Sequence, residues 1–246
     1  MKIALAYLVG VTVAEVLTVS ISSMWGIAFH IALLVAVIIY SAIITDEVRQ
    51  HFFLSLALVP LTRIISLSMP LANIPQIWWY PIIYMPLLLA TFQVMRLMKS
   101  NVDQVGLNLR SIKFQIIVAL SGLVIGVLEY FILMEEARVT GQILGETWLL
   151  SVFFLLSCTG FVEEFMFRGV IHTAAVRMFG WWGIVYVSYL FSIVHWIHNS
   201  VLDIFFVFIV ALFFGWVVKK TGSLVGVILA HGIANTVLFL VMPLVF

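Results

Sequence analysis

The stretch "WLLSVFFLLSCTGFVEEFMFRGVIHTAAVRM", residues 148–178, decides the class of fold to which this chain belongs. It is longer than the roughly 20 apolar residues that a helix needs to cross the hydrocarbon core of a bilayer. Yet it carries Glu163, Glu164 and Arg168 within two helical turns. Each ionisable side chain near the bilayer centre costs about 2.5–3.5 kcal/mol. The stretch therefore predicts a membrane helix bundle that encloses a polar site.

The composition supports a membrane protein. Of the 246 residues, 64% are hydrophobic and only 9% are charged, whereas a soluble domain carries about 25% charged residues. The net charge of +1 leaves no electrostatic footprint for nucleic acid, so no nucleic-acid partner is expected. A single cysteine, Cys158, excludes an intramolecular disulfide, and we interpret it as an apolar packing residue in its helix.

The apolar runs predict an all-α fold, a polytopic membrane helix bundle of about nine transmembrane helices. Pro60 and Arg63 interrupt the third run, and the sixth is so long that part of it should lie beyond the hydrocarbon. The runs lie near residues 3–22, 25–44, 52–69, 76–97, 114–134, 148–178, 181–198, 201–218 and 222–245.

Basic residues fall at alternate ends of successive runs. The opposite loops, "ISSMW", "PLANIPQ", "EEARVTGQILGE" and "IHNSVLD", hold one basic residue, Arg138. Because cytoplasmic loops are enriched in Lys and Arg, this pattern predicts a cytoplasmic N-terminus and a C-terminus outside. The basic residues of the cytoplasmic ends are Lys2, Arg49, Arg96, Lys99, Arg110, Lys113, Arg177, Lys219 and Lys220.

The longest polar connection, "KSNVDQVGLNLRSIK", covers residues 99–113. We predict N-terminal transmembrane helices over 1–98, a cytoplasmic linker with the fifth transmembrane helix over 99–146, and a functional region over 147–246. The segment "VGLNLR" in the connection is either a short amphipathic piece that lies in the membrane interface or an ordinary basic loop. The small-residue spacings Gly122/Gly126 and Gly222/Gly226 favour close helix packing.

Polar residues in the last spans form three groups. Ionisable residues inside a span indicate function by default. Glu164 and Arg168 are four residues apart and can pair on one helix face, while Glu163 is rotated by about 100° and can face a cavity. The groups are Glu163, Glu164 and Arg168; then His195; then His231 and Asn235, which share a face and can converge with the others at one depth.

These residue types suit the hydrolysis of an amide bond by an activated water. A carboxylate in a cavity of low dielectric can act as a general base, and a neighbouring histidine can hold the water. A second histidine and an asparagine amide can donate to a developing oxyanion. The alternative is a polar cluster that only holds helices together, which a single pair such as Glu164 and Arg168 would do.

Three short motifs resemble those of a known family. "EEFMFR" (163–168) is similar to EExxxR, "FSIVH" (191–195) to FxxxH, and "HGIAN" (231–235) to HxxxN. Together, and in this order, they resemble the CAAX prenyl endopeptidase and bacteriocin-processing family, also called the Abi group, of intramembrane proteases. The resemblance covers about residues 147–245, and the earlier helices match nothing as specific.

The resemblance implies roles for the matched residues. Glu163 would activate water as the general base, with His195 assisting, and His231 and Asn235 would bind the oxyanion. The supporting residues would be Glu164, Arg168 and Phe191, of which Phe191 would pack beside the site. By contrast, we expect Glu15, Arg63 and Glu129 in the N-terminal spans to be buried ion-pair partners or snorkelling residues.

The function implied is that of an intramembrane endopeptidase, a hydrolase acting on membrane-associated proteins or peptides, with prenylated ones among the candidates. Its substrate would enter from the cytoplasm or laterally from lipid. The protein would be an integral multi-pass membrane protein, and its compact chain favours a prokaryotic cell membrane. The sequence indicates no oligomeric state.

Two alternatives remain open. Glu163, His195 and His231 could be the three protein ligands of a catalytic zinc. The sequence lacks HExxH, however, and the paired glutamates favour a metal-independent glutamate protease without a cofactor. An alternative of another class is a proton- or ion-coupled transporter, although no interrupted pair of helices indicates inverted repeats.

Overall fold

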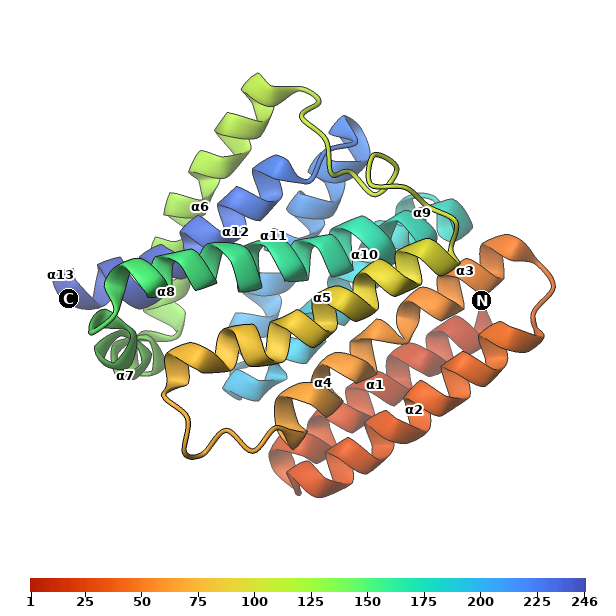
Figure 1. Ribbon diagram of the computed structural model, residues 1–246, viewed down its shortest axis with the longest axis horizontal. Coiled ribbons are helices and arrows are strands. Elements are labelled where there is room, and N and C mark those ends of the chain that lie inside the picture. Colours follow the sequence, from red (N-terminus) through yellow and green to blue (C-terminus); the bar gives the residue numbers. More distant parts are fainter. The chain divides into compact units, whose positions relative to one another are not determined.

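The computed structural model describes all 246 residues as helices joined by turns and loops, without a strand (Figure 1). This confirms the predicted all-α class. Eight helices are long and apolar enough to cross a membrane. They are Lys2–Ser20, Ser23–Ile43, Glu47–Ser68, Gln76–Leu97, Ile112–Ile132, Trp148–Phe179, Val201–Thr221 and Val225–Val245.

The remaining predicted span, 181–198, is also helical but is not uniform. It consists of α10 (Trp181–Ile193) and a 3₁₀ turn, η4 (Val194–His198), which carries His195. Asn199, with φ of +50°, ends this turn in a left-handed conformation. The predicted orientation of the chain in the membrane stays a prediction.

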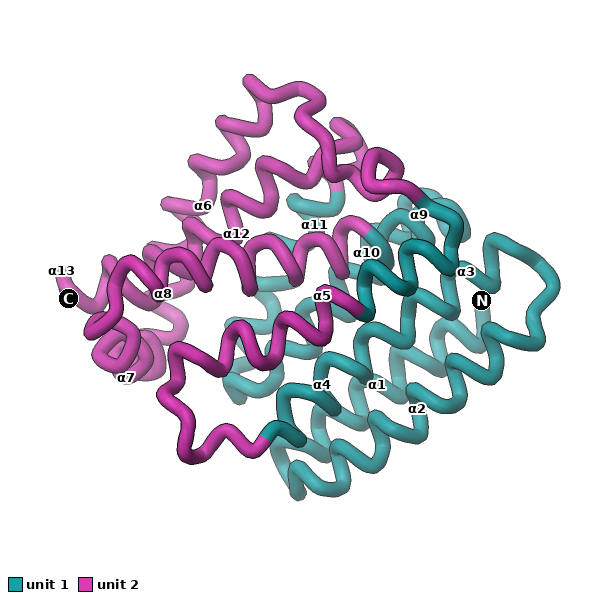
Figure 2. The backbone as a smooth tube through the Cα atoms, viewed as in Figure 1, with its two compact units in different colours: residues 1–69, 90–100, 170–215 teal, residues 70–89, 101–169, 216–246 magenta.

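The chain forms two compact units, in each of which distant segments come together (Figure 2). Unit 1 comprises Met1–Met69, Ala90–Ser100 and Val170–Gly215. The three-part division predicted along the sequence stays a prediction. The helices of unit 1 are α1 (Lys2–Ser20), α2 (Ser23–Ile43), α3 (Glu47–Leu56), α4 (Leu58–Ser68), α9 (His172–Phe179), α10, η4, the end of α5 (Trp79–Leu97), the end of η3 (Phe165–Ile171) and most of α11 (Val201–Thr221).

Unit 2 comprises Pro70–Leu89, Asn101–Gly169 and Trp216–Phe246. Cys158 packs there in an apolar cluster with Phe154, Leu155 and Leu240, as predicted. The helices of unit 2 are η1 (Gln76–Trp78), the start of α5, α6 (Ile112–Ile132), α7 (Met134–Gly145), α8 (Trp148–Phe154), η2 (Leu155–Glu163), most of η3 (Phe165–Ile171), the end of α11, α12 (Val225–Thr236), η5 (Val237–Val241) and α13 (Met242–Val245).

The third predicted span is a helix interrupted shortly before its proline, Pro60. Helix α3 ends at Leu56 and α4 begins at Leu58, with Ala57 between them. Pro60 therefore lies in the first turn of α4, where its missing N–H removes no bond within that helix. The break leaves Arg63 in the middle of α4, where its side chain is buried.

The stretch "EEARVTGQILGE" was expected as an external loop, and this prediction is wrong in its local structure, because α7 covers most of it. Glu135 and Glu136 lie in the first turn of α7, where carboxylates favour a helix through its dipole. Ala137 and Leu144 are buried and lie seven residues apart, on one face. The packing of this short apolar face stabilises the helix, and the prediction of a loop did not take it into account.

The polar connection before α6 contains no helix over 101–111. It is an ordered loop bound to the turn between α11 and α12. Asn108 Nδ2 donates to the carbonyl of Gly222 at 2.8 Å, and Ser223 Oγ donates to the carbonyl of Asn108 at 2.6 Å. The backbone N–H of Leu224 donates to the carbonyl of Gly106 at 2.8 Å. The segment "VGLNLR" is therefore a loop, and its position at the membrane interface stays a prediction.

Glycines bring α6 against α12, as the spacing Gly122/Gly126 predicts. A Cβ atom at Gly122 would collide with the backbone of Ala230, and one at Gly126 with the carbonyl of Ala234. The two glycines of the second spacing, Gly222 and Gly226, have different roles. Gly226 packs on Gln115, whose Oε1 accepts from the Gly226 N–H at 2.7 Å, whereas Gly222 is a left-handed residue after α11, with φ of +68°, and makes no helix contact.

Candidate active site

The two glutamates lie where the longest helix widens. Leu155–Glu163 and Phe165–Ile171 have π-helical geometry, with Glu164 between the two segments. Such π-helical turns are rare in proteins overall, but those that occur are often found at functional sites. They leave Glu163 partly exposed, at 18% of its side chain, and Glu164 fully buried, at 0%.

Glu164 is enclosed by two positively polarised partners that reach the same oxygen. Arg168 Nη1 donates to Glu164 Oε1 at 3.0 Å, which confirms the predicted pairing of these residues. His231 Nδ1 lies 2.8 Å from the same Oε1. An ionised carboxylate can only accept, so Nδ1 of His231 is the donor in this bond. The bond to Glu164 thereby turns the other ring nitrogen, Nε2, toward Glu163.

Glu163 is the accessible carboxylate of the pair. The hydroxyl of Tyr84, from α5, donates to its Oε1. Its Oε2 lies 3.9 Å from Nε2 of His231. The imidazole of His231 therefore lies between the two carboxylates, bonded to the buried one through Nδ1 and turned to the accessible one through Nε2.

Asn235 is oriented by a threonine of the widened helix. Asn235 Nδ2 donates to Thr159 Oγ1 at 2.9 Å, and the hydroxyl of Thr159 donates to the carbonyl of Leu155 at 2.6 Å. One of the two N–H groups of the Asn235 amide is therefore committed to Thr159. This bond fixes the plane of the amide relative to η2.

Two glycines allow α12 to reach η2. A Cβ atom at Gly160 would lie 2.8 Å from the carbonyl oxygen of Ile228 and 3.0 Å from the nitrogen of Gly232, so any side chain would push the helices apart. Gly160 precedes Glu163 by one helical turn, and Gly232 follows His231 directly. The backbone approach at these glycines sets the distance between the carboxylates and the imidazole.

Phe191 and His195 belong to unit 1, on α10 and η4. His195 Nδ1 lies 2.8 Å from the carbonyl oxygen of Phe191, and the two rings are 4.8 Å apart. Since a carbonyl can only accept, Nδ1 carries the proton and Nε2 is the basic nitrogen when the ring is neutral. The spacing of FxxxH thus serves to fix a tautomer. The convergence of His195 with Glu163 stays a prediction.

Sequence reasoning missed Tyr84 and Thr159. Tyr84 lies in an apolar span with no motif around it, and its only signal is that a buried tyrosine hydroxyl usually requires a partner. Thr159 lies four residues before Glu163, on an adjacent part of the same helix, and resembles any small residue of a membrane span. Both are recognised only through contacts made across the fold.

The zinc alternative requires three ligands. The structure contains no group of three or more His, Cys, Asp or Glu side chains arranged to hold a metal ion. Within unit 2, Nδ1 of His231 is already bonded to Glu164, which leaves Nε2 and the carboxylate of Glu163 as the donors that would face an ion.

Together, the apolar helices and the cluster of carboxylates, histidine and arginine describe a polytopic helical membrane protein with a polar, largely buried cluster in unit 2. Residues 145–237 match the family model described as type II CAAX prenyl endopeptidase Rce1-like. The matched region contains all three motifs, and the match confirms the resemblance to this protease family. No curated protein and no solved structure matches the chain.

The buried pair predicts an asymmetric response to mutation. Arg168→Met should lower the free energy of unfolding by about 3–5 kcal/mol, because it leaves the buried carboxylate of Glu164 uncompensated. Adding Glu164→Gln should restore part of this loss. Denaturant unfolding in mixed micelles measures both. A double variant that is as unstable as the sum of its single variants would show that the two residues are not coupled.

Proposed function

We propose that this chain is an intramembrane endopeptidase of the glutamate type, in which Glu163 activates a water for attack on a peptide bond. The observation that carries the proposal is the asymmetry of two adjacent carboxylates. Glu164 is fully buried and bonded to Arg168 and His231, whereas Glu163 is partly exposed and oriented by Tyr84. The match of residues 145–237 to a family of CAAX endopeptidases supports the same reaction.

The proposed reaction uses each residue at a stated atom. Glu163 removes a proton from water, and the water oxygen attacks the carbonyl carbon of the peptide while the carbonyl electrons move to its oxygen. When the tetrahedral intermediate collapses, the C–N bond breaks and Glu163 returns the proton to the leaving nitrogen. His195, with Nε2 as its basic nitrogen, would assist in holding the water.

Asn235 and His231 would stabilise the oxyanion. Asn235 has a second N–H beside the one that is bonded to Thr159. For His231, Nδ1 already donates to Glu164, so donation from Nε2 requires the imidazolium form of the ring. Contacts of the ring with both glutamates would hold that form in place.

The proposed substrates are membrane-associated proteins or peptides that enter from the cytoplasm or from lipid. Prenylated C-terminal peptides are the first class to test, because the matched family model is named for them. A farnesylated peptide and the same peptide without the lipid, both added to proteoliposomes, form a matched pair of probes.

Loss of the proposed base should stop the reaction. Glu163→Gln removes the basic oxygen at nearly constant volume, and we expect cleavage to fall by about 10²- to 10⁴-fold. Mass spectrometry of the peptide products measures the rate. Glu135→Gln, at an exposed position of α7, is the matched control and should cleave like the wild type. If Glu163→Gln cleaved at the wild-type rate, the glutamate mechanism would be wrong.

Tyr84 should orient the base without taking part in proton transfer. Tyr84→Phe deletes one hydrogen bond to Glu163, and a bond of about 1 kcal/mol corresponds to a fall in kcat of about fivefold. Tyr80→Phe is the control, because Tyr80 stacks near Tyr84 with ring centroids 6.4 Å apart and makes no hydrogen bond to Glu163. An equal effect of both substitutions would argue against a specific role of the Tyr84 hydroxyl.

Metal independence is tested by chelation of the purified, active protein. We expect full activity after exhaustive dialysis against a strong chelator, because the proposed base acts on water directly. Peptide cleavage and the zinc content of the same samples are measured together. Loss of activity that added zinc restores would instead support the three-ligand zinc alternative.

A further inference from the structure

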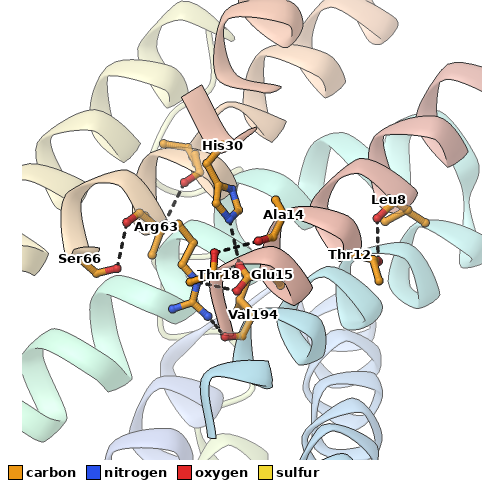
Figure 3. A network of polar contacts seen from close by, with 11 residues as sticks. Leu8, Thr12, Ala14, Glu15, Thr18, His30, Arg63, Ser66 and Val194 are labelled. Atoms are coloured by element: carbon orange, nitrogen blue, oxygen red, sulfur yellow. Dashed lines mark hydrogen bonds and ion pairs between the residues drawn. The ribbon is translucent and has the colours of Figure 1, made fainter. Parts of the chain in front are cut away.

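A buried polar network joins three N-terminal helices of unit 1 (Figure 3). Arg63 of α4 donates through Nε to both oxygens of Glu15 of α1, at 2.8 and 3.0 Å. His30 of α2 places Nε2 3.5 Å from Glu15 Oε1. The side chains of Glu15 and His30 are fully buried, and that of Arg63 is 8% exposed. This confirms the prediction that Glu15 and Arg63 are buried ion-pair partners.

A second nitrogen of the guanidinium reaches the backbone beside a motif histidine. Arg63 Nη2 donates to the carbonyl of Val194, the first residue of η4 and the residue directly before His195 (Figure 3). Carbonyls at the end of a helix lack donors within the helix and require partners from outside. Arg63 supplies such a donor at the point where α10 passes into the 3₁₀ turn.

Stability alone is a weak reason for such a network in a membrane. Apolar residues of similar volume often replace a buried ion pair without loss, because burial of two charges is costly. Arginine, however, presents several donors in a rigid planar fork, which binds a carboxylate and a carbonyl at once. Lysine offers a point charge on a flexible stem and cannot reproduce both contacts.

We propose that Arg63, held by Glu15, is a positioning residue for His195, an inference that rests on the proposed function. His195 is then fixed from two sides. Its backbone is held through the Arg63 bond to Val194, and its ring through the bond from Nδ1 to the carbonyl of Phe191. The N-terminal helices, which carry none of the three motifs, would thereby set the direction of the basic Nε2 atom.

The test is Arg63→Lys, which keeps the charge beside Glu15 and removes the fork. With a farnesylated peptide in proteoliposomes, we expect kcat to fall by about ten- to a hundredfold while KM stays unchanged, because misplacement of a catalytic group lowers turnover without removing substrate contacts. The unfolding midpoint should stay close to that of the wild type.

Thr12→Val is the matched control, because it breaks another polar contact of α1 within unit 1. Thr12 Oγ1 lies 2.7 Å from the hydroxyl of Tyr189 on α10, five residues before Val194. This variant should lose some stability and keep its kcat. If Thr12→Val lowered kcat as much as Arg63→Lys does, the network would be merely structural and the inference would be overturned.

A second readout does not depend on cleavage. Modification of His195 by diethyl pyrocarbonate, followed by mass spectrometry, reports the exposure and orientation of its ring. We expect the modification rate of His195 to change severalfold in Arg63→Lys and to stay constant in Thr12→Val. An unchanged rate together with an unchanged kcat would overturn the inference. Failure of the proposed function looks different, since Glu163→Gln would then leave cleavage unaffected.

Discussion

One buried carboxylate oxygen organises the site of unit 2. Glu164 Oε1 accepts from Arg168 on its own helix and from His231 on α12. A buried carboxylate without such partners would be prohibitively costly in an apolar bundle, so the sequence must supply a cation and a donor close by. That requirement fixes which nitrogen of His231 is committed, and it leaves Glu163 as the carboxylate that faces the accessible part of the site.

Small residues make this chemistry possible. Gly160 lets α12 approach the widened helix closely enough for His231 to lie between the two glutamates, and Gly122 and Gly126 let α6 support α12 from another side. In a membrane, helices associate through close packing and polar contacts rather than through exclusion of water. The glycines therefore determine the distances in the site as much as the charged residues do.

In unit 1, a buried ion pair likewise orients a neighbouring group, which here is a backbone carbonyl. Its buried charges, Glu15 and Arg63, pair with each other, and Arg63 donates one more hydrogen bond to Val194, the residue directly before His195. Phe191 completes the arrangement through its carbonyl, which selects the tautomer of the ring. In both units an oxygen atom accepts from Nδ1 of a histidine. Glu164 does so for His231, and the carbonyl of Phe191 does so for His195.

The sequence by itself determined the helical membrane class, the motif residues and the pairing of Glu164 with Arg168, because apolar run length and i,i+4 spacing are local properties. It failed where local patterns compete with packing. The helix α7 was mistaken for a loop, since its buried face of Ala137 and Leu144 is short, and Gly222 was mistaken for a packing residue.

Only the tertiary structure decided how the site is built. Tyr84 and Thr159 bond to Glu163 and Asn235 from positions that no motif marks. Arg63 bonds to Val194, directly before His195, across 131 residues of sequence. Such contacts depend on which helix faces come together, and this depends on glycine approaches and buried polar partners rather than on hydrophobic periodicity. The physical reason is that a hydrogen bond is set by distance in space, which the order of residues along one helix does not specify.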